Sequence, residues 1–147
     1  MWLLVTEIIH VVAYLCVGAL VYFFWKKYFT IKNYILGFLF TFFIDVDHYI
    51  DMLMYDGFSL DIKRFISGEH FRESGKVYIF FHAWEYVLLV FVLFWVFRKS
   101  RIAGPLLFIF LGLGVHLIVD IITNNSTFLT YSLFYRILVD FRLDLLY

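Results

Sequence analysis

Residues 42–51 read FFIDVDHYID and place three aspartates and a histidine directly after an apolar run. The charged residues are Asp45, Asp47, His48 and Asp51, and the preceding run, YILGFLFTFFI, is apolar enough to lie in a lipid bilayer. Ionisable side chains are costly inside a membrane, and they usually belong to a site when they occur there. The stretch therefore predicts a membrane helix with a polar site at one end.

The composition is that of a membrane protein. Of the 147 residues, 64% are hydrophobic and only 16% are charged, whereas a soluble domain has about 45–50% apolar and about 25% charged residues. The formal net charge is zero. The chain therefore lacks the basic field typical of nucleic-acid binding, and we expect no nucleic-acid partner. A single proline and a uniform composition indicate one domain over residues 1–147.

Four apolar runs are long enough to cross a membrane, because a hydrocarbon core of about 30 Å needs about 20 helical residues. We expect helices over residues 3–24, 34–55, 77–97 and 105–122. Residues 127–147 mix arginines and aspartates with aromatics, which indicates an amphipathic or bundle-packed segment. The predicted fold class is all-α, a polytopic membrane four-helix bundle with an additional C-terminal segment.

The charges of the connections predict the orientation of this bundle. The connections KKYFTIK and RKSR, after the first and third predicted helices, carry six basic residues and no acidic ones. The connection between the second and third helices mixes four basic with four acidic residues. Because basic loops stay preferentially on the cytoplasmic side, we expect both termini on the non-cytoplasmic side.

Each predicted helix carries a carboxylate and a histidine three or four residues apart: Glu7 and His10, Asp45 and His48, His82 and Glu85, and His116 and Asp120. This spacing puts both members of a pair on one helix face. The pairs lie alternately early and late in helices that alternate in direction, so all of them fall at the non-cytoplasmic end. Carboxylates and imidazoles on facing helices form the metal sites of helical bundles. The pattern predicts one shared metal site.

A lone histidine in an apolar helix is usually a packing residue, but four matching pairs favour metal ligands here. The predicted ligands are His10, Asp45, Asp47, His48, His82, Glu85, His116 and Asp120. Glu7 and Glu85 are the candidates for a general base. Asp51 fits either a solvated helix end or the site. His70 and Arg72 fit either a polar loop or a contact with substrate, and the sequence leaves these alternatives open.

The order of these residues resembles that of a family of small prokaryotic inner-membrane proteins, the membrane-bound metal-dependent hydrolases. The family motifs P-D-x-D-H and G-x-x-x-H-x-x-x-D correspond here to IDVDHYID and GLGVHLIVDIIT, and the resemblance covers residues 6–135. It implies a metal site formed by His10, Asp45, Asp47, His48, His82, His116 and Asp120. Ile44 replaces the proline of the first motif, and the compact H-R-G-x-T-H of the family is replaced by EHFRESGKVYIFFH. The family's substrate contacts therefore cannot be transferred to this chain.

Two clustered divalent ions held by mixed Asp and His ligands suit hydrolysis of a phosphoester. Zinc is the first choice for this mixture of ligands, and manganese and iron are the alternatives. The nearby cationic residues Lys63, Arg64 and Arg72 suit the phosphate of a membrane lipid or of a lipid-linked phosphate. The sequence thus predicts a membrane-embedded metal-dependent hydrolase in the prokaryotic inner membrane, with its site on the non-cytoplasmic side.

Three other functions use the same residues. The sequence Glu7-x-x-His10 is also the motif of di-iron bundles, which makes a di-iron lipid oxidoreductase an alternative. Intramembrane carboxylates and histidines also serve non-enzymatic metal or proton carriers. Finally, a metal with a purely structural role would hold the four helices together. The oligomeric state is not predicted.

Overall fold

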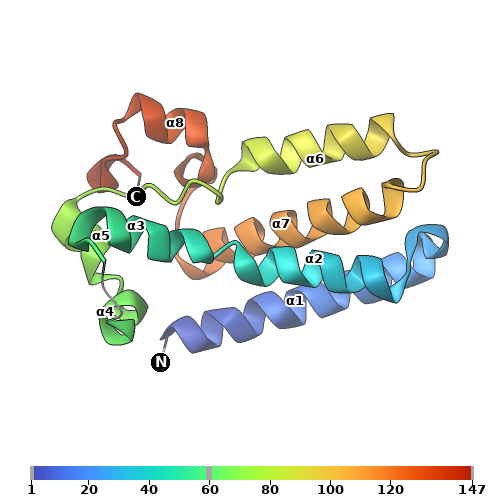
Figure 1. Ribbon diagram of the computed structural model, residues 1–147, viewed down its shortest axis with the longest axis horizontal. Helices are drawn as coiled ribbons and strands as arrows, with labels where there is room; N and C mark the ends of the chain where they lie inside the picture. Colours follow the sequence, from blue (N-terminus) through green and yellow to red (C-terminus); the bar gives the residue numbers. More distant parts are fainter. Residues whose placement is uncertain (1, 59–60, 147) are drawn as a thin grey trace.

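The computed structural model describes residues 2–58 and 61–146, with side chains from Val5 onward, and the helices within them confirm the all-α prediction. Four helices follow the long axis in Figure 1: α1 (Trp2–Phe24), α2 (Ile31–Phe43), α6 (Trp84–Val96) and α7 (Ala103–Thr123). Four shorter helices gather at one end: α3 (Val46–Asp56), α4 (Ile62–Ser67), α5 (Glu69–Ser74) and α8 (Leu133–Leu138). Three 3-10 helices lie in connections: η1 (Lys26–Tyr28), η2 (Phe128–Tyr131) and η3 (Leu143–Leu145).

Helix α7 is the central helix, because it packs against α1, α2 and α6. Its approach to α2 depends on two glycines. A Cβ added to Gly112 would collide with the backbone carbonyl of Gly37, and a Cβ added to Gly37 would collide with the carbonyl of Phe108. The two backbones therefore meet at a distance that larger residues would not permit, and this fixes the position of α2 relative to α7.

The predicted helix 34–55 forms two helices, α2 and α3, with a turn between them at Ile44 and Asp45. At this turn the amide of Asp47 donates to the carbonyl of Ile44 (3.3 Å), and the amide of His48 donates to that of Asp45 (3.1 Å). This is the three-residue spacing of a 3-10 turn, which recurs within helices at functional positions. The residues quoted from the sequence thus lie on both sides of a local change in helix geometry.

The predicted helix 77–97 is helical only from Trp84 onward, and residues 77–83 are non-helical, with a turn at Phe80 and Phe81. Their sequence, VYIFFHA, is rich in β-branched and aromatic residues, which favour extended backbone. The segment also pairs with the end of the chain, since the amide of Val77 donates to the carbonyl of Phe141 (2.9 Å). His82 therefore lies on non-helical backbone ahead of α6, and the prediction that it lies inside a helix was wrong.

Residues 127–146 pack onto the end of the bundle that carries the short helices (Figure 1). Tyr131 and Leu146 are buried in an apolar cluster that also contains Val87 and Leu117. The hydroxyl of Thr130 donates to the carbonyl of Leu146 (2.6 Å), which ties the two ends of this segment together. Of the two arrangements predicted for this part of the chain, the structure has the bundle-packed one.

Two helices are long and apolar enough to cross a membrane: Val5–Phe24 within α1, and α7. Helices α2 and α6 have 13 residues each, fewer than the about 20 residues that a full span needs. Of the four spans predicted from the sequence, two therefore meet the requirement of length as single helices.

Replacing Gly112 with alanine is expected to lower the free energy of unfolding by about 1–3 kcal/mol, because the added methyl group forces α2 away from α7. Gly114→Ala is the matched control, since its Cβ would lie 3.7 Å from Val87 Cγ1, an ordinary contact. In the control, alanine should instead stabilise the helix, because it is a better helix former than glycine by about 1 kcal/mol. Thermal unfolding in detergent checks this prediction, and equal melting temperatures of the two variants would contradict it.

Candidate metal centre

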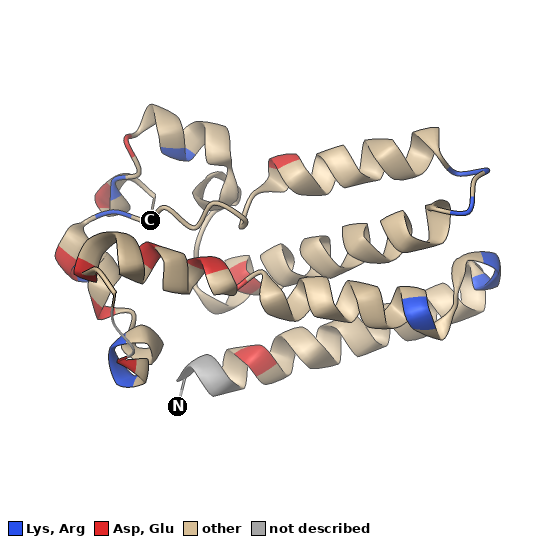
Figure 2. Ribbon diagram, viewed as in Figure 1, with Lys and Arg blue, Asp and Glu red and all other residues tan. Residues whose placement is uncertain are grey.

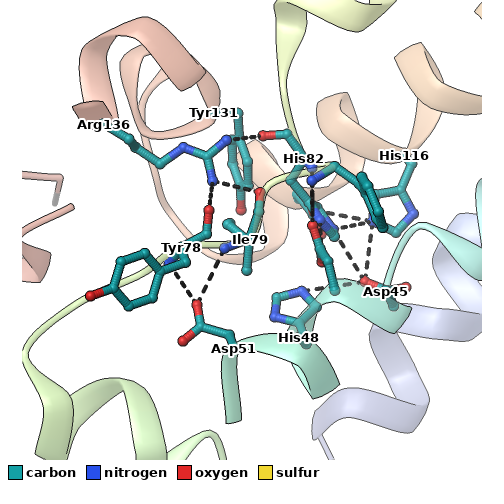
Figure 3. Close-up of polar contacts among 12 residues, drawn as sticks. Asp45, His48, Asp51, Tyr78, Ile79, His82, His116, Tyr131 and Arg136 are labelled. Carbon is teal, nitrogen blue, oxygen red and sulfur yellow. Dashed lines mark hydrogen bonds and ion pairs between the residues drawn. The ribbon is translucent and has the colours of Figure 1, made fainter. Parts of the chain in front are cut away.

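Histidine and aspartate side chains from α7, the turn between α2 and α3, and segment 77–83 converge at the end of the bundle (Figure 3). His82 Nε2 lies 3.1 Å from His116 Nε2 and 3.2 Å from Asp45 Oδ1. Asp120 Oδ2 lies 3.2 Å from His116 Nε2 and 3.6 Å from His82 Nε2. Both histidines are fully buried. Two imidazole nitrogens and two carboxylate oxygens thus share one small space.

The other ring nitrogen of each histidine is directed at an acceptor. His116 Nδ1 lies 2.8 Å from the carbonyl oxygen of Thr41, in the last turn of α2. His82 Nδ1 lies 2.9 Å from Asp47 Oδ1, at ion-pair distance but without hydrogen-bond geometry. The hydrogen bond places the proton of His116 on Nδ1, and the nearby Asp47 carboxylate favours the same tautomer of His82, which leaves the Nε2 lone pairs directed at each other. A carbonyl or carboxylate that orients a ring through its second nitrogen is the usual support of a histidine metal ligand.

This arrangement requires positive charge at its centre. Four acceptor atoms at 3.1–3.6 Å repel one another unless protons or a cation lie between them. Burial strengthens the requirement, because water cannot screen the repulsion. The mixture of imidazole nitrogens and carboxylate oxygens is a ligand set of divalent metals. The residues present therefore fit a metal ion.

His10 and His48 extend the cluster in two directions. His10 Nε2 lies 3.2 Å from Asp120 Oδ1, and its ring stacks on that of His116 with 4.0 Å between centroids. His48 Nε2 lies 3.4 Å from Asp45 Oδ1. Three groups have ligand atoms within 4.8 Å of one another: His10, His116 and Asp120; Asp45, His82 and His116; and Asp47, His48 and His82. The groups share His82 and His116, so they form one continuous centre.

Asp47 and Asp51 bind the backbone of segment 77–83. Asp51 Oδ2 accepts from the amides of Tyr78 (2.5 Å) and Ile79 (3.2 Å), and Asp47 Oδ2 accepts from those of Phe81 (2.6 Å) and His82 (3.3 Å). Both carboxylates are almost completely buried. The alternative that Asp51 is a solvated residue beyond a helix end is therefore wrong. Asp47 lies within reach of a metal group, but its contacts mainly hold His82 and its backbone in place.

Glu85 does not lie at this centre, which corrects its prediction as a metal ligand and general base. Its carboxylate accepts from the Ser132 hydroxyl (2.7 Å) and from the amides of Leu133 (3.0 Å) and Phe134 (3.2 Å). These are the first amides of α8, which have no partner within their own helix. The pairing with His82 assumed a continuous helix. Because α6 begins at Trp84, the two side chains do not share a helix face.

A cavity of about 1080 Å³ opens onto the centre. Its polar lining includes Glu7, His10, Asp45, His48 and Asp120, while aromatic side chains of Phe42, Phe43, Phe65 and Phe71 form part of its walls. The carboxylate of Glu7 lies within hydrogen-bonding reach of Asp45 and belongs to none of the metal groups. Glu7 is therefore the predicted general base that the structure places beside the centre.

The cationic residues predicted to contact substrate divide into two kinds. Lys63 and Arg72 line the cavity. Arg64, in contrast, donates to Asp56 (2.6 and 2.8 Å) and to Glu73, and this hydrogen bonding lowers the pKa of the exposed Asp56.

His70, for which the sequence left a contact with substrate open, is fully buried and lines no part of the cavity. Burial lowers its pKa to about 4, so it is neutral at pH 7.

The sequence did not indicate two groups that support the centre. One is the carbonyl of Thr41, which receives His116. The other is Arg136, a fully buried arginine of α8 that donates to the carbonyls of Tyr78 (2.9 Å), Ile79 (2.6 Å) and His82 (2.6 Å) (Figure 3). An arginine among aromatic residues was the available signal, but its partners depend on the non-helical backbone of 77–83.

A comparison of the chain with protein-family models, curated proteins and solved structures gave no match. The family resemblance noted in the sequence therefore remains a prediction that depends on the motif residues. What the structure adds is the buried groups of histidine and aspartate that can hold a metal ion.

His116→Ala is expected to remove most bound metal, because it deletes a nitrogen shared by two of the three groups. Asp45→Asn should act in the same direction, since an amide keeps the shape but loses the charge that offsets a cation. His70→Asn is the control, as it removes an imidazole that lies outside these groups. Metal content of the purified, folded variants measures the effect. Unchanged content in His116→Ala would contradict the centre.

Proposed function

We propose that the protein is a membrane-embedded, metal-dependent hydrolase that cleaves a phosphoester of a lipid or of a lipid-linked phosphate. The observation that carries the proposal is the cavity of about 1080 Å³, because it brings an apolar wall, cationic side chains and the metal-binding groups together. A phosphorylated lipid has the matching parts, namely an apolar chain and an anionic ester. This proposal gives a function to the motif residues from which the family resemblance was inferred.

Exposed apolar surface supports a membrane location. Four apolar side chains of α1 have exposed fractions of 51–77%: Ile8, Val12, Leu20 and Phe23. A core helix of a soluble protein would bury such residues. Similar residues are exposed along α2 and α6. We place α1, α2, α6 and α7 in the prokaryotic inner membrane as a four-helix bundle. Helices α2 and α6 are too short to span it alone, and each does so together with the segment that adjoins it in sequence, α3 for α2 and residues 77–83 for α6.

The distribution of charge supports an orientation. In Figure 2 the end opposite the short helices carries basic residues and no acidic ones, whereas the end with the metal centre carries both. These basic residues are Lys26, Lys27 and Lys32, the last in the first turn of α2, and Arg98, Lys99 and Arg101. By the positive-inside tendency these face the cytoplasm. The cavity then opens on the non-cytoplasmic side.

The residues of the centre suit two metal ions. His10, His116 and Asp120 would hold one, and Asp47, His48 and His82 the other, while Asp45 lies beside His48, His82 and His116. Zinc fits this mixture best, and manganese and iron also fit. When bound, such ions lower the pKa of water and stabilise charge on a phosphoryl oxygen.

The remaining cavity residues supply binding and proton transfer. Lys63 and Arg72 would form ion pairs with the phosphate, because neither forms an ion pair with a carboxylate among the described residues, whereas Arg64 does. Phe65 and Phe71 pack against the apolar chain of the substrate. Glu7 accepts the proton of the attacking water on its carboxylate, since it adjoins Asp45 without belonging to a metal group.

Glu7→Gln is expected to lower the rate of phosphoester cleavage by about 10²-fold or more while metal content stays complete, because a general base typically contributes 10²–10⁴-fold. The assay measures phosphate or a phosphorylated head group released from lipid phosphates in micelles, by protein loaded with zinc or manganese. His116→Ala is the metal-deficient control.

Full activity of Glu7→Gln would remove its catalytic role. A metal-loaded wild-type protein that cleaves no phospholipid, polyprenyl phosphate or polyprenyl diphosphate would contradict the hydrolase. Bound iron with an absorbance change on oxidation would favour the oxidoreductase.

The orientation predicts that Glu69 is accessible from outside the cell and Ser100 is not. Both positions are exposed, so cysteines placed there should react with a membrane-impermeant reagent when it reaches them. The substitutions are made in a Cys16→Ala background, because Cys16 is the single native cysteine. In intact cells Glu69→Cys should be labelled and Ser100→Cys only after permeabilisation. The reverse pattern would move the centre to the cytoplasmic side.

A further inference from the structure

Segment 77–83 carries His82 and is held along both of its edges by buried charged side chains. Asp47 and Asp51 accept its amide hydrogens from one side. From the other side, Arg136 donates to three of its carbonyls (Figure 3). Two backbone hydrogen bonds lie inside the segment, from the amide of His82 to the carbonyl of Ile79 (3.1 Å) and from that of Ala83 to Phe81 (2.9 Å), so most of its backbone groups need other partners. Its course therefore depends on the side chains of two distant parts of the sequence, α3 and α8.

We propose that Arg136 is a positioning residue of the metal centre. By holding the carbonyl of His82 at 2.6 Å, opposite the carboxylate of Asp47, it fixes the backbone from which the His82 ring reaches Asp45 and His116. This role rests on the proposed function, because it assumes that the centre binds metal. It concerns a residue outside the ligand groups, in the last part of the chain.

The chemistry of the guanidinium group explains why an arginine stands here. Its planar fork directs donors to several acceptors at once, whereas a lysine offers a single ammonium group. Nη1 donates to both Tyr78 and Ile79, and Nη2 donates to His82. Burial lowers the pKa of Arg136, but the charge of nearby Asp47 opposes this shift. Among the described residues no carboxylate forms an ion pair with it, so its hydrogen bonds go to the carbonyls.

Further hydrogen bonds join the C-terminal segment to the chain on both sides of the contacts that Arg136 makes. The amide of Leu143 donates to the carbonyl of Gly75 (2.8 Å), and that of Val77 donates to the carbonyl of Phe141 (2.9 Å). On the other side, Glu85 binds the first amides of α8. Residues 75–85 and 132–143 are thus joined by a set of hydrogen bonds, which we call the clasp, and Arg136 lies at its middle.

A reciprocal effect follows from this arrangement. If the clasp favours the geometry of His82 that binds metal, then bound metal must favour the closed clasp by the same free energy. Metal should therefore stabilise residues 133–143 even though none of them belongs to a ligand group. A purely structural role of Arg136, independent of the centre, would not produce this coupling.

The test compares Arg136→Met and Arg136→Lys with Arg142→Met in the full-length protein in detergent. Arg142 is the control because it is an exposed arginine of the same segment, whose side chain binds Asp144. Arg136→Met should weaken zinc binding, measured by chelator competition, by about 10–100-fold, the usual effect of losing a group that orients a ligand. It should also change the visible absorption bands of bound cobalt. Arg136→Lys should restore part of both, and Arg142→Met should match the wild type.

The same experiment has a wild-type arm that does not depend on how the variants fold. Hydrogen exchange of the wild-type protein should slow in peptides covering 77–83 and 133–143 together when zinc is added, but not in 98–102. Unchanged affinity and cobalt spectrum in folded Arg136→Met would overturn the positioning role and leave the proposed function intact. Absence of zinc-dependent protection in 133–143 would also overturn it. A wild-type protein that binds no metal would overturn both.

Discussion

The repulsion among acceptor atoms at the centre is the constraint on which the rest of the structure depends. His82, His116, Asp45 and Asp120 place nitrogen and oxygen atoms 3.1–3.6 Å apart in a buried space. Such a cluster is stable only when positive charge lies within it. Each supporting contact then acts to hold the acceptors in place against their repulsion. Thr41 and Asp47 hold the two rings, and the glycine contact between α2 and α7 sets the distance between their helices.

Helical spacing predicted much of this centre, and it failed where the backbone is not helical. The pairs Glu7 with His10 and His116 with Asp120 lie on α1 and α7, which are continuous helices. These residues come together at one end, as the alternating direction of the helices implied. His82 and Glu85 have the same spacing, but α6 starts between them. Glu85 therefore serves α8, and the spacing carried no information about its neighbours.

The role of the C-terminal segment could not be predicted, because it depends on a backbone course that local sequence does not determine. Sequence patterns show which residues prefer extended structure, but not which distant side chains will satisfy its amides and carbonyls. Here Asp47, Asp51 and Arg136 perform that task. Polar backbone near an apolar bundle must be satisfied within the protein. A buried arginine or aspartate beside a run such as VYIFFHA is therefore a reason to look for non-helical backbone.

The shape of the centre distinguishes among its possible uses. Structural metal sites are closed by protein ligands, whereas catalytic sites keep a face open to substrate. His82 and His116 are sealed in the interior, but His10, Asp45, His48 and Asp120 line the cavity. The centre thus has one closed and one open face, which favours a reactive metal over a structural one. A carrier needs polar groups that continue toward the other membrane surface, yet the parts of α1, α2, α6 and α7 nearest the basic connections contain no aspartate, glutamate or histidine. A cavity lined by cationic and aromatic side chains beside these groups therefore fits the proposed hydrolase better than it fits the carrier.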